Sequence, residues 1–118
     1  AIVAVAGLSS HAISPVKSCV DCSFKLREIA NSYSMPWDLH LGIHSGSLVA
    51  GTVGTKTVQF DILGKTVNVA FNICDMSESN QILISSDAWM TARNEIKVKS
   101  IGLKRLKSGQ DIEMLECV

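Results

Sequence analysis

The chain has 118 residues, of which 47% are hydrophobic and 19% charged, and its eleven basic side chains balance its eleven acidic ones. This composition fits one compact globular domain and excludes a disordered tail. We expect no nucleic-acid partner, because such proteins show a basic stripe with interleaved aromatic residues, whereas this chain has only two Trp, one Tyr and three Phe, scattered along it.

The chain contains no apolar run near the roughly 18 residues that a membrane span requires. Its first seven residues lack the charged segment that begins a signal peptide. We therefore expect this segment to be cytoplasmic and to make no membrane contact. The sequence also begins without Met, inside an apolar stretch, which predicts that it is a fragment of a larger protein.

In chain order, residues 1–7 predict a buried strand, and Ser14-Pro15 predicts the start of a helix that runs to about Tyr33, with serine as the cap. Cys19 and Cys22 form a C-x-x-C pair within this helix. A redox dithiol or half of a zinc site is the less favoured interpretation, because zinc needs a second ligand pair. The 3-4 spacing of apolar residues instead predicts a buried helix stripe, formed by Cys19, Cys22, Leu26, Ile29 and Tyr33.

The next segment, from Trp37 to Ile43, alternates apolar with polar residues or glycine and predicts a half-buried strand whose inward residues begin with Trp37. Three glycines predict a bend: Gly46, Gly51 and Gly54. No G-x-x-x-x-G-K-S/T segment, as a phosphate-binding P-loop would require, is present among or after them. Residues 58–63 predict another strand. A helix then opens at Gly64, and its predicted buried stripe is Val67, Ala70, Phe71 and Cys74.

The last third of the chain predicts a short strand over residues 81–84, followed by a short helix capped by Ser85 or Ser86. Residues 97–106 and 111–118 predict two strands joined by a hairpin turn at residues 107–110, with glycine in the left-handed conformation. Strands that alternate with helices and end in a hairpin predict an α+β fold, an α/β sandwich with helices packed on a mixed sheet.

Two blocks of sequence carry a family resemblance. Residues 39–54 contain G-I-H-S-G followed by G-T-V-G, and residues 59–70 read Q-F-D-I-L-G-K-T-V-N-V-A. In this order and at this spacing they resemble the class III adenylyl and guanylyl cyclases. The likeness extends loosely over nearly the whole chain. It implies a cyclase-type, ferredoxin-like mixed sheet, and a single partial catalytic domain over residues 1–118 that lacks the N-terminal metal-binding part.

The resemblance also implies an activity. In this family two catalytic domains pair head to tail, and two magnesium or manganese ions held by two aspartates of one subunit activate the ribose 3′-hydroxyl to attack the α-phosphate. The expected reaction converts ATP into 3′,5′-cyclic AMP and pyrophosphate in intracellular signalling. The chain would supply the base and ribose side of a homodimer or of a heterodimer of cyclase domains. It contains no match to the two metal-binding aspartates, so no metal ligand is assigned to it.

Residue by residue, Asp61 matches the aspartate that reads the base, where guanylyl members carry cysteine. A carboxylate suits adenine, whose exocyclic amine is a donor. Asn68 matches the asparagine that positions the ribose, and Lys107 the lysine that binds the phosphates. Asn72 stands where the family has an arginine for the charge that develops in the transition state. An amide supplies neither the charge nor the forked donors of arginine.

Two other readings remain. Asn72 favours a catalytically degenerate cyclase-homology module that dimerises or binds nucleotide for regulation, and the strand and helix pattern alone also permits a generic α+β interaction domain. His40 and His44 share a predicted strand face with Asp38, but residues i and i+4 of a strand lie about 13 Å apart, too far to bind one metal ion together. We therefore expect both histidines at the surface or at an interface.

Overall fold

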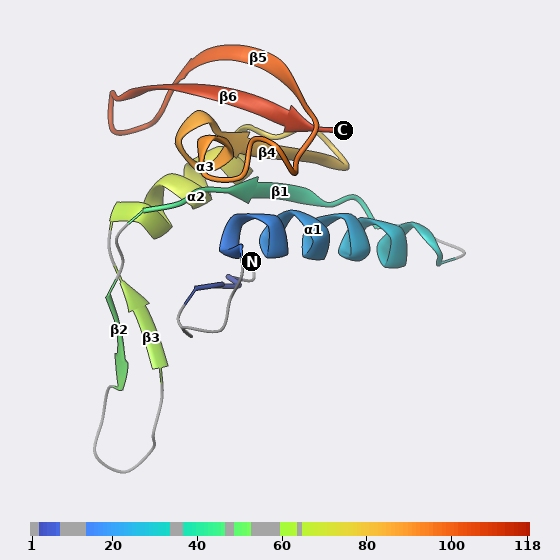
Figure 1. Ribbon diagram of the computed structural model, residues 1–118, viewed down its shortest axis with the longest axis horizontal. Coiled ribbons are helices and arrows are strands. Elements are labelled where there is room, and N and C mark those ends of the chain that lie inside the picture. Colours follow the sequence, from blue (N-terminus) through green and yellow to red (C-terminus); the bar gives the residue numbers. More distant parts are fainter. Residues whose placement is uncertain (1–2, 8–13, 34–36, 47–48, 53–59, 64) are drawn as a thin grey trace.

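The structure is a computed structural model that describes residues 3–7, 14–33, 37–46, 49–52, 60–63 and 65–118, with only the backbone described for 49–52 and 60–63. Its main sheet has the strand order β1-β4-β6-β5 (Figure 1), in which β1 is parallel to β4 and the other pairs are antiparallel. The strands are β1 His40–Ile43, β4 Gln81–Ser85, β5 Val98–Arg105 and β6 Asp111–Cys117. The predicted mixed sheet is confirmed.

Helices cover both faces of this sheet, because β4 and β6 are apolar on both sides. Ile82 and Ile84 of β4 pack with helices α1, Pro15–Asn31, and α3, Ser86–Met90, whereas Leu83 packs with helix α2, Lys65–Met76. Strands buried on two faces have near-continuous apolar sequences. The result is the α/β sandwich that the alternation of elements predicts. Within the described part of the chain, no helix has the length and apolar character of a membrane span.

Helix α1 begins as predicted but presents a different face to the core. Ser14 is the extended N-cap residue and Pro15 the first helical residue, but the side chain of Ser14 makes no capping hydrogen bond. The predicted stripe is wrong: Cys22 is exposed, and Leu26, Ile29 and Tyr33 are 47%, 46% and 60% exposed. Only Cys19 of that stripe is half-buried, and the buried residues are Val16, Val20, Ser23 and Ala30. The two cysteines are therefore not a pair of core residues.

The two chain segments that flank α1 also differ from expectation. Residues 3–7 form no strand, which requires a hydrogen-bonded neighbouring strand, and they lie instead beside α1 (Figure 1). Trp37, predicted to point inward, is 69% exposed and stacks on Tyr33 with ring centroids 6.5 Å apart. Strand β1 accordingly starts at His40 rather than at Trp37.

A second, two-stranded sheet replaces part of the predicted glycine bend. Strands β2, Val49–Thr52, and β3, Phe60–Leu63, pair antiparallel with Gly51 opposite Asp61. They form an arm that extends from the main body near the start of α2 (Figure 1). Gly51 thus lies within a strand, Gly54 lies outside the described residues, and Gly46 lies in a bend.

Ser85 joins β4 to α3 through two interactions of one hydroxyl group. The side chain is fully buried, and its Oγ accepts a hydrogen bond from the backbone N–H of Ala88 at 3.2 Å and lies 2.7 Å from Nδ1 of His44. This confirms the predicted serine cap. We expect Ser85→Ala to lower the free energy of unfolding by about 1–2 kcal/mol, because two buried polar groups lose their partner.

Urea-induced unfolding of the domain measures this cost, and Ser86→Ala is the matched control. Ser86 is the first helical residue, and the side chain that caps the helix belongs to Ser85. A loss of stability in Ser86→Ala equal to that in Ser85→Ala would contradict the assigned cap.

Candidate functional site

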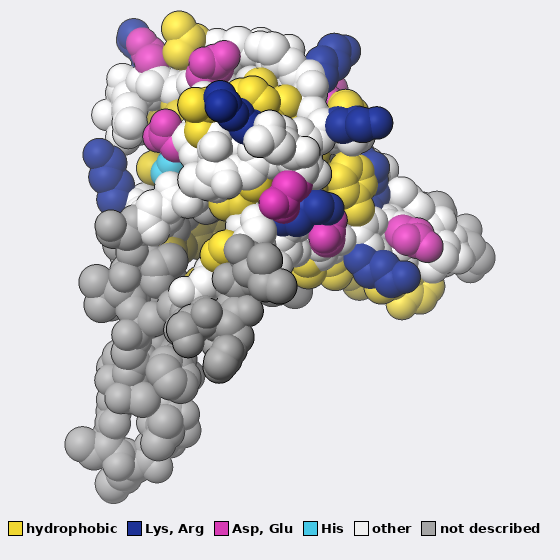
Figure 2. All heavy atoms as spheres, viewed as in Figure 1, with side chains coloured by type: hydrophobic (Ala, Val, Ile, Leu, Met, Phe, Trp, Pro, Cys, Tyr) yellow, Lys and Arg dark blue, Asp and Glu magenta, His cyan; other side chains and the backbone are white. Residues whose placement is uncertain are grey.

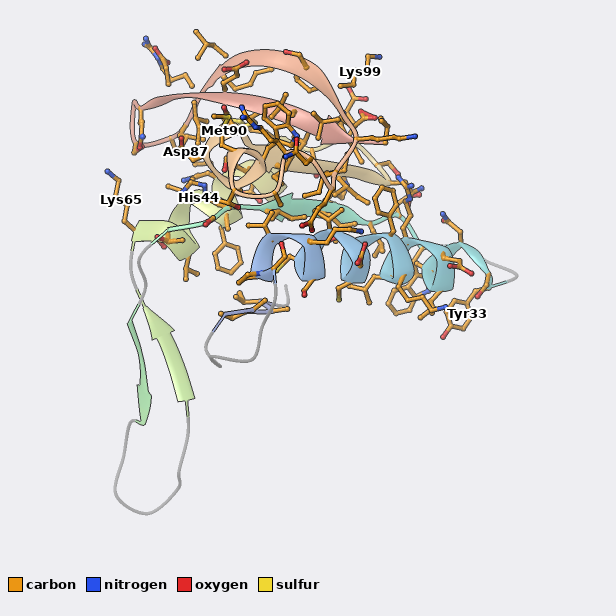
Figure 3. All side chains as sticks on the ribbon, in the orientation of Figure 1. Tyr33, His44, Lys65, Asp87, Met90 and Lys99 are labelled. Atoms are coloured by element: carbon orange, nitrogen blue, oxygen red, sulfur yellow. The ribbon has the colours of Figure 1, made fainter. Side chains whose placement is uncertain are left out.

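Three polar residues of α2 share one side of the helix. Asn68, Asn72 and Asp75 follow one another at spacings of four and three residues, which places them on a single face. Asn68 and Asp75 are exposed and Asn72 is half-buried. Lys65 begins the same face one turn earlier and extends away from the body of the molecule (Figure 3). We call Asn68, Asn72 and Asp75 the polar face of α2.

The buried side of α2 fixes the orientation of this face. Val69 and Ile73, at 6% and 0% exposure, pack with Leu83, Met114 and other residues of the sheet. The predicted buried stripe is therefore wrong in phase: Val67, Ala70 and Cys74 are half-buried, and Phe71 is 39% exposed. Seven of the twelve residues of α2 are apolar, so the sequence permits several rotations of the helix, and packing on β4 and β6 selects one.

Strand β1 and α2 approach each other unusually closely at Gly42. A Cβ atom placed on Gly42 would lie 2.4 Å from the backbone nitrogen of Cys74 and 2.8 Å from the backbone oxygen of Ala70. In addition, Sγ of Cys74 donates a hydrogen bond to the backbone oxygen of His40 at 3.1 Å. A residue with a Cβ atom would not fit at this position. The glycine of the G-I-H-S-G block therefore permits the close packing of α2 on the sheet.

The turn between β5 and β6 places Lys107 at the end of the polar face. Leu106 is 2% exposed and anchors the turn, its N–H donates to the oxygen of Gln110 at 2.8 Å, and its oxygen accepts from the N–H of Gly109 at 2.9 Å. Gly109 has a φ of 91°, the left-handed conformation that the sequence predicts. Nζ of Lys107 lies 3.5 Å from Oδ2 of Asp75, in the last turn of α2.

The structure thus brings together three of the four predicted site residues. Asn68 and Asn72 lie on the polar face of α2, and Lys107 joins this face through its contact with Asp75. The fourth, Asp61, belongs to β3, and its side chain lies outside the described part of the structure. Asp75 was missed by the sequence reasoning. The available signal was its spacing, three residues after Asn72 and seven after Asn68, which puts a carboxylate on the face assigned to the nucleotide.

The two histidines of the G-I-H-S-G region have separate partners. Nδ1 of His40 lies 2.8 Å from the backbone oxygen of Ser77, while His44 contacts Ser85. Burial lowers the pKa of His44, and the neighbouring carboxylate of Asp87 partly offsets that effect (Figure 3). Among the described residues, no group of three or more His, Cys, Asp or Glu side chains could hold a metal ion. The two-metal site that the family resemblance implies is therefore not assigned to any described side chain.

One surface cavity of the described residues lies apart from the polar face of α2. A cavity of about 190 Å³ lies between residues 3–4, β1 and α2, and its lining is mainly apolar: Val3, Ala4, Leu41, Val67, Ala70 and Phe71, among others. The residues that line this cavity do not include Asn68, Asn72 or Lys107. Acidic and basic side chains of the described residues are interspersed over the face shown in Figure 2.

Comparison with known proteins identifies the family. The family model of the adenylate and guanylate cyclase catalytic domain matches residues 1–115. The chain belongs to this family. It is similar to the soluble guanylate cyclase gcy-31 of Caenorhabditis elegans, at 35% identity over 65% of this chain and 10% of that protein. It is also similar to the aggregation-specific adenylate cyclase of Dictyostelium discoideum, at 28% identity over 74% of this chain and 6% of that protein.

Solved structures of cyclase domains share the fold. The guanylate cyclase domain of RhGC from Catenaria anguillulae, in complex with GTP, superposes with a TM-score of 0.85 at 17% identity, over 96% of this chain and 64% of that one. The adenylyl cyclase CyaB from P. aeruginosa superposes with a TM-score of 0.82 at 20% identity, over 97% of this chain and 64% of that one. The cyclase-type fold predicted from the sequence is therefore confirmed. The chain spans about a tenth or less of the two curated relatives and under two thirds of these solved domains.

Proposed function

We propose that this domain forms the base- and ribose-binding side of an adenylate cyclase site, in the cytoplasmic part of a larger signalling protein. Paired with a second cyclase domain, identical or related, it would act on ATP to give cyclic AMP and pyrophosphate. The observation that carries the proposal is the polar face of α2, which exposes Asn68 and ends beside Lys107, in a chain of the cyclase family. Two magnesium or manganese ions are part of the proposed site, held by groups other than the described residues.

The roles of this chain's own residues follow from their chemistry. The amide of Asn68 can donate to and accept from ribose hydroxyls, and the ammonium group of Lys107 can neutralise phosphate oxygens. Asn68 and Lys107 lie at different ends of the polar face. Lys107 contacts Asp75, and Asn68 and Asp75 are about 10 Å apart along the helix axis. A nucleotide placed along this face would be oriented at its sugar and at its phosphates. Positioning and electrostatic stabilisation are the main contributions in phosphoryl transfer.

Preference for ATP is proposed from Asp61. Its carboxylate would accept a hydrogen bond from the exocyclic amine of adenine. Guanylate cyclases predominate among the curated relatives. The family resemblance implies cysteine at this position in guanylyl members, so the proposed preference for ATP rests on Asp61.

Nucleotide preference provides the test. We expect the full-length protein, assayed with Mn²⁺, to form cyclic AMP from ATP, and Asp61→Cys to lower the ratio of kcat/KM for ATP to that for GTP by about 10- to 100-fold, the cost of leaving a buried donor unpaired. Asp38→Cys, at an exposed aspartate ahead of β1, is the control and should leave the ratio unchanged. Equal use of GTP by the unmodified protein, or an unchanged ratio in Asp61→Cys, would refute the proposed preference.

A second candidate function is favoured by Asn72. A cyclase-homology module that dimerises or binds nucleotide without turnover would not need the family's arginine, and here an amide replaces it. Such a module would still bind ATP through Asp61, Asn68 and Lys107. The two functions differ in what happens when the charge is restored at position 72.

A further inference from the structure

The contact between Lys107 and Asp75 has a consequence for the nucleotide. Lys107 is the proposed phosphate ligand, yet its ammonium group already lies 3.5 Å from a carboxylate oxygen. Both side chains are well exposed, at 78% for Lys107 and 60% for Asp75. Exposed ion pairs of this kind contribute little to stability. The pair can therefore open at small cost when another anion competes for the lysine.

The position of Asp75 makes the surroundings of Lys107 unfavourable for a phosphate. Asp75 lies in the last turn of α2, where the unpaired carbonyl groups give the helix end a partial negative charge. That turn contains no basic residue of its own. Among the described residues, Lys107 is the cation paired with Asp75, so a phosphate that binds Lys107 must displace Asp75 and remain close to its negative charge.

Lys107 cannot escape this competition by a shift of its backbone. The turn that carries it is held by the buried side chain of Leu106 and by the two backbone hydrogen bonds between Leu106 and residues 109 and 110. These contacts hold the backbone at Lys107, and its flexible side chain can turn from the carboxylate to a phosphate.

We propose that Asp75 sets the affinity of the site for nucleotide by competing with the polyphosphate for Lys107. Asp75 keeps polyphosphate binding weak and dependent on ionic strength, and it contributes no contact of its own to the substrate. This role rests on the proposed function of Lys107 as the phosphate-binding residue. It concerns the polyphosphate alone, so the base and the ribose are not involved.

Calorimetry on the full-length protein tests this role with inorganic tripolyphosphate, ATP and adenosine as probes. We expect Asp75→Asn, which keeps the size and removes the charge, to tighten binding of tripolyphosphate and ATP by about fivefold at low salt, the scale of an exposed ion pair. Binding of adenosine should not change. The gain should shrink as the ionic strength rises to about 0.5 M, because salt screens exposed charges.

Three further variants test whether the effect acts through the lysine. Glu78→Gln removes an exposed negative charge three residues beyond Asp75 and is the matched control, expected to alter tripolyphosphate affinity by less than twofold. In a Lys107→Ala background, Asp75→Asn should change the affinity for tripolyphosphate no more than Glu78→Gln does. The reason is that Asp75 acts through its contact with Lys107. Asp75→Ser serves as a second neutral variant at the exposed position.

The possible results separate this role from the proposed activity. Tighter tripolyphosphate binding in Asp75→Asn, together with no cyclic AMP from the unmodified protein, would support the competition and reject the cyclase activity. Cyclic AMP formation by the unmodified protein, with unchanged or weaker tripolyphosphate binding in both Asp75 variants, would support the cyclase activity and reject the competition. Absence of tripolyphosphate binding in every variant, or an equal gain in the Lys107→Ala background, would overturn the role of Asp75.

Discussion

Asn72→Arg is expected to raise the rate of cyclic AMP formation by the full-length protein about 100-fold. The expectation rests on the proposed activity. Asn72 lies on the polar face of α2, one turn after Asn68, where the family has an arginine. Arginine offers five donors and a permanent charge, whereas the amide of asparagine offers two donors and carries no charge. Removing one positioned donor from a charge-stabilising site typically slows an enzyme 100- to 1,000-fold, and restoring the group should recover much of that factor.

Steady-state assays with ATP measure the change, with Asn72→Lys and Asn72→Gln as controls. Lysine restores the charge without the fork and should give a smaller gain, and glutamine should give none. Asp75 lies three residues after position 72 and could pair with the new arginine, so the double variant with Asp75→Asn should be faster than Asn72→Arg alone. If ATP binds but the rate stays unchanged in all of these variants, the chain is a nucleotide-binding regulatory module.

The fold could be read from the sequence wherever local signals and tertiary contacts agree. The helix at Ser14-Pro15, the serine cap before α3 and the glycine turn between β5 and β6 all depend on residues close together in the chain, and each is confirmed. Strand β3 lies within the strand predicted over residues 58–63, whereas β2 was missed because it contains Gly51, a residue type depleted in strands. Residues 3–7 have the composition of a strand but no strand neighbour among the described residues.

Rotation of the helices could not be predicted in the same way. Leu26 and Ile29 of α1 follow an apolar 3-4 spacing as regular as that of Val16 and Val20, yet only the second pair is buried. Periodicity identifies a helix with two apolar sides but does not identify the side that packs on the sheet. On α2, Asn68 and Asn72 could be placed on one face from their spacing alone, whereas the contact of Asp75 with Lys107 joins residues 32 positions apart and requires the fold.

Gly42→Ala is expected to lower the free energy of unfolding by about 3 kcal/mol, the upper part of the usual range for overpacking. The added Cβ would meet three backbone atoms of α2, the nitrogen and Cα of Cys74 and the oxygen of Ala70, at 2.4, 2.9 and 2.8 Å. Backbone atoms cannot rotate away as a side chain does. Helix α2 would have to move from β1 and lose its hydrogen bond from Cys74 to His40.

Gly46→Ala is the matched control, because its Cβ would lie 2.6 Å from Oγ1 of the Thr66 side chain and no closer than 3.4 Å to the other atoms nearby. A change of rotamer relieves that contact, so we expect a cost of about 1 kcal/mol. Urea-induced unfolding of the domain compares the two variants. Equal costs would mean that α2 tolerates displacement from β1. In that case the glycine of the G-I-H-S-G block would not be what holds the polar face of α2, with Asn68 and Asn72, in its position relative to the sheet.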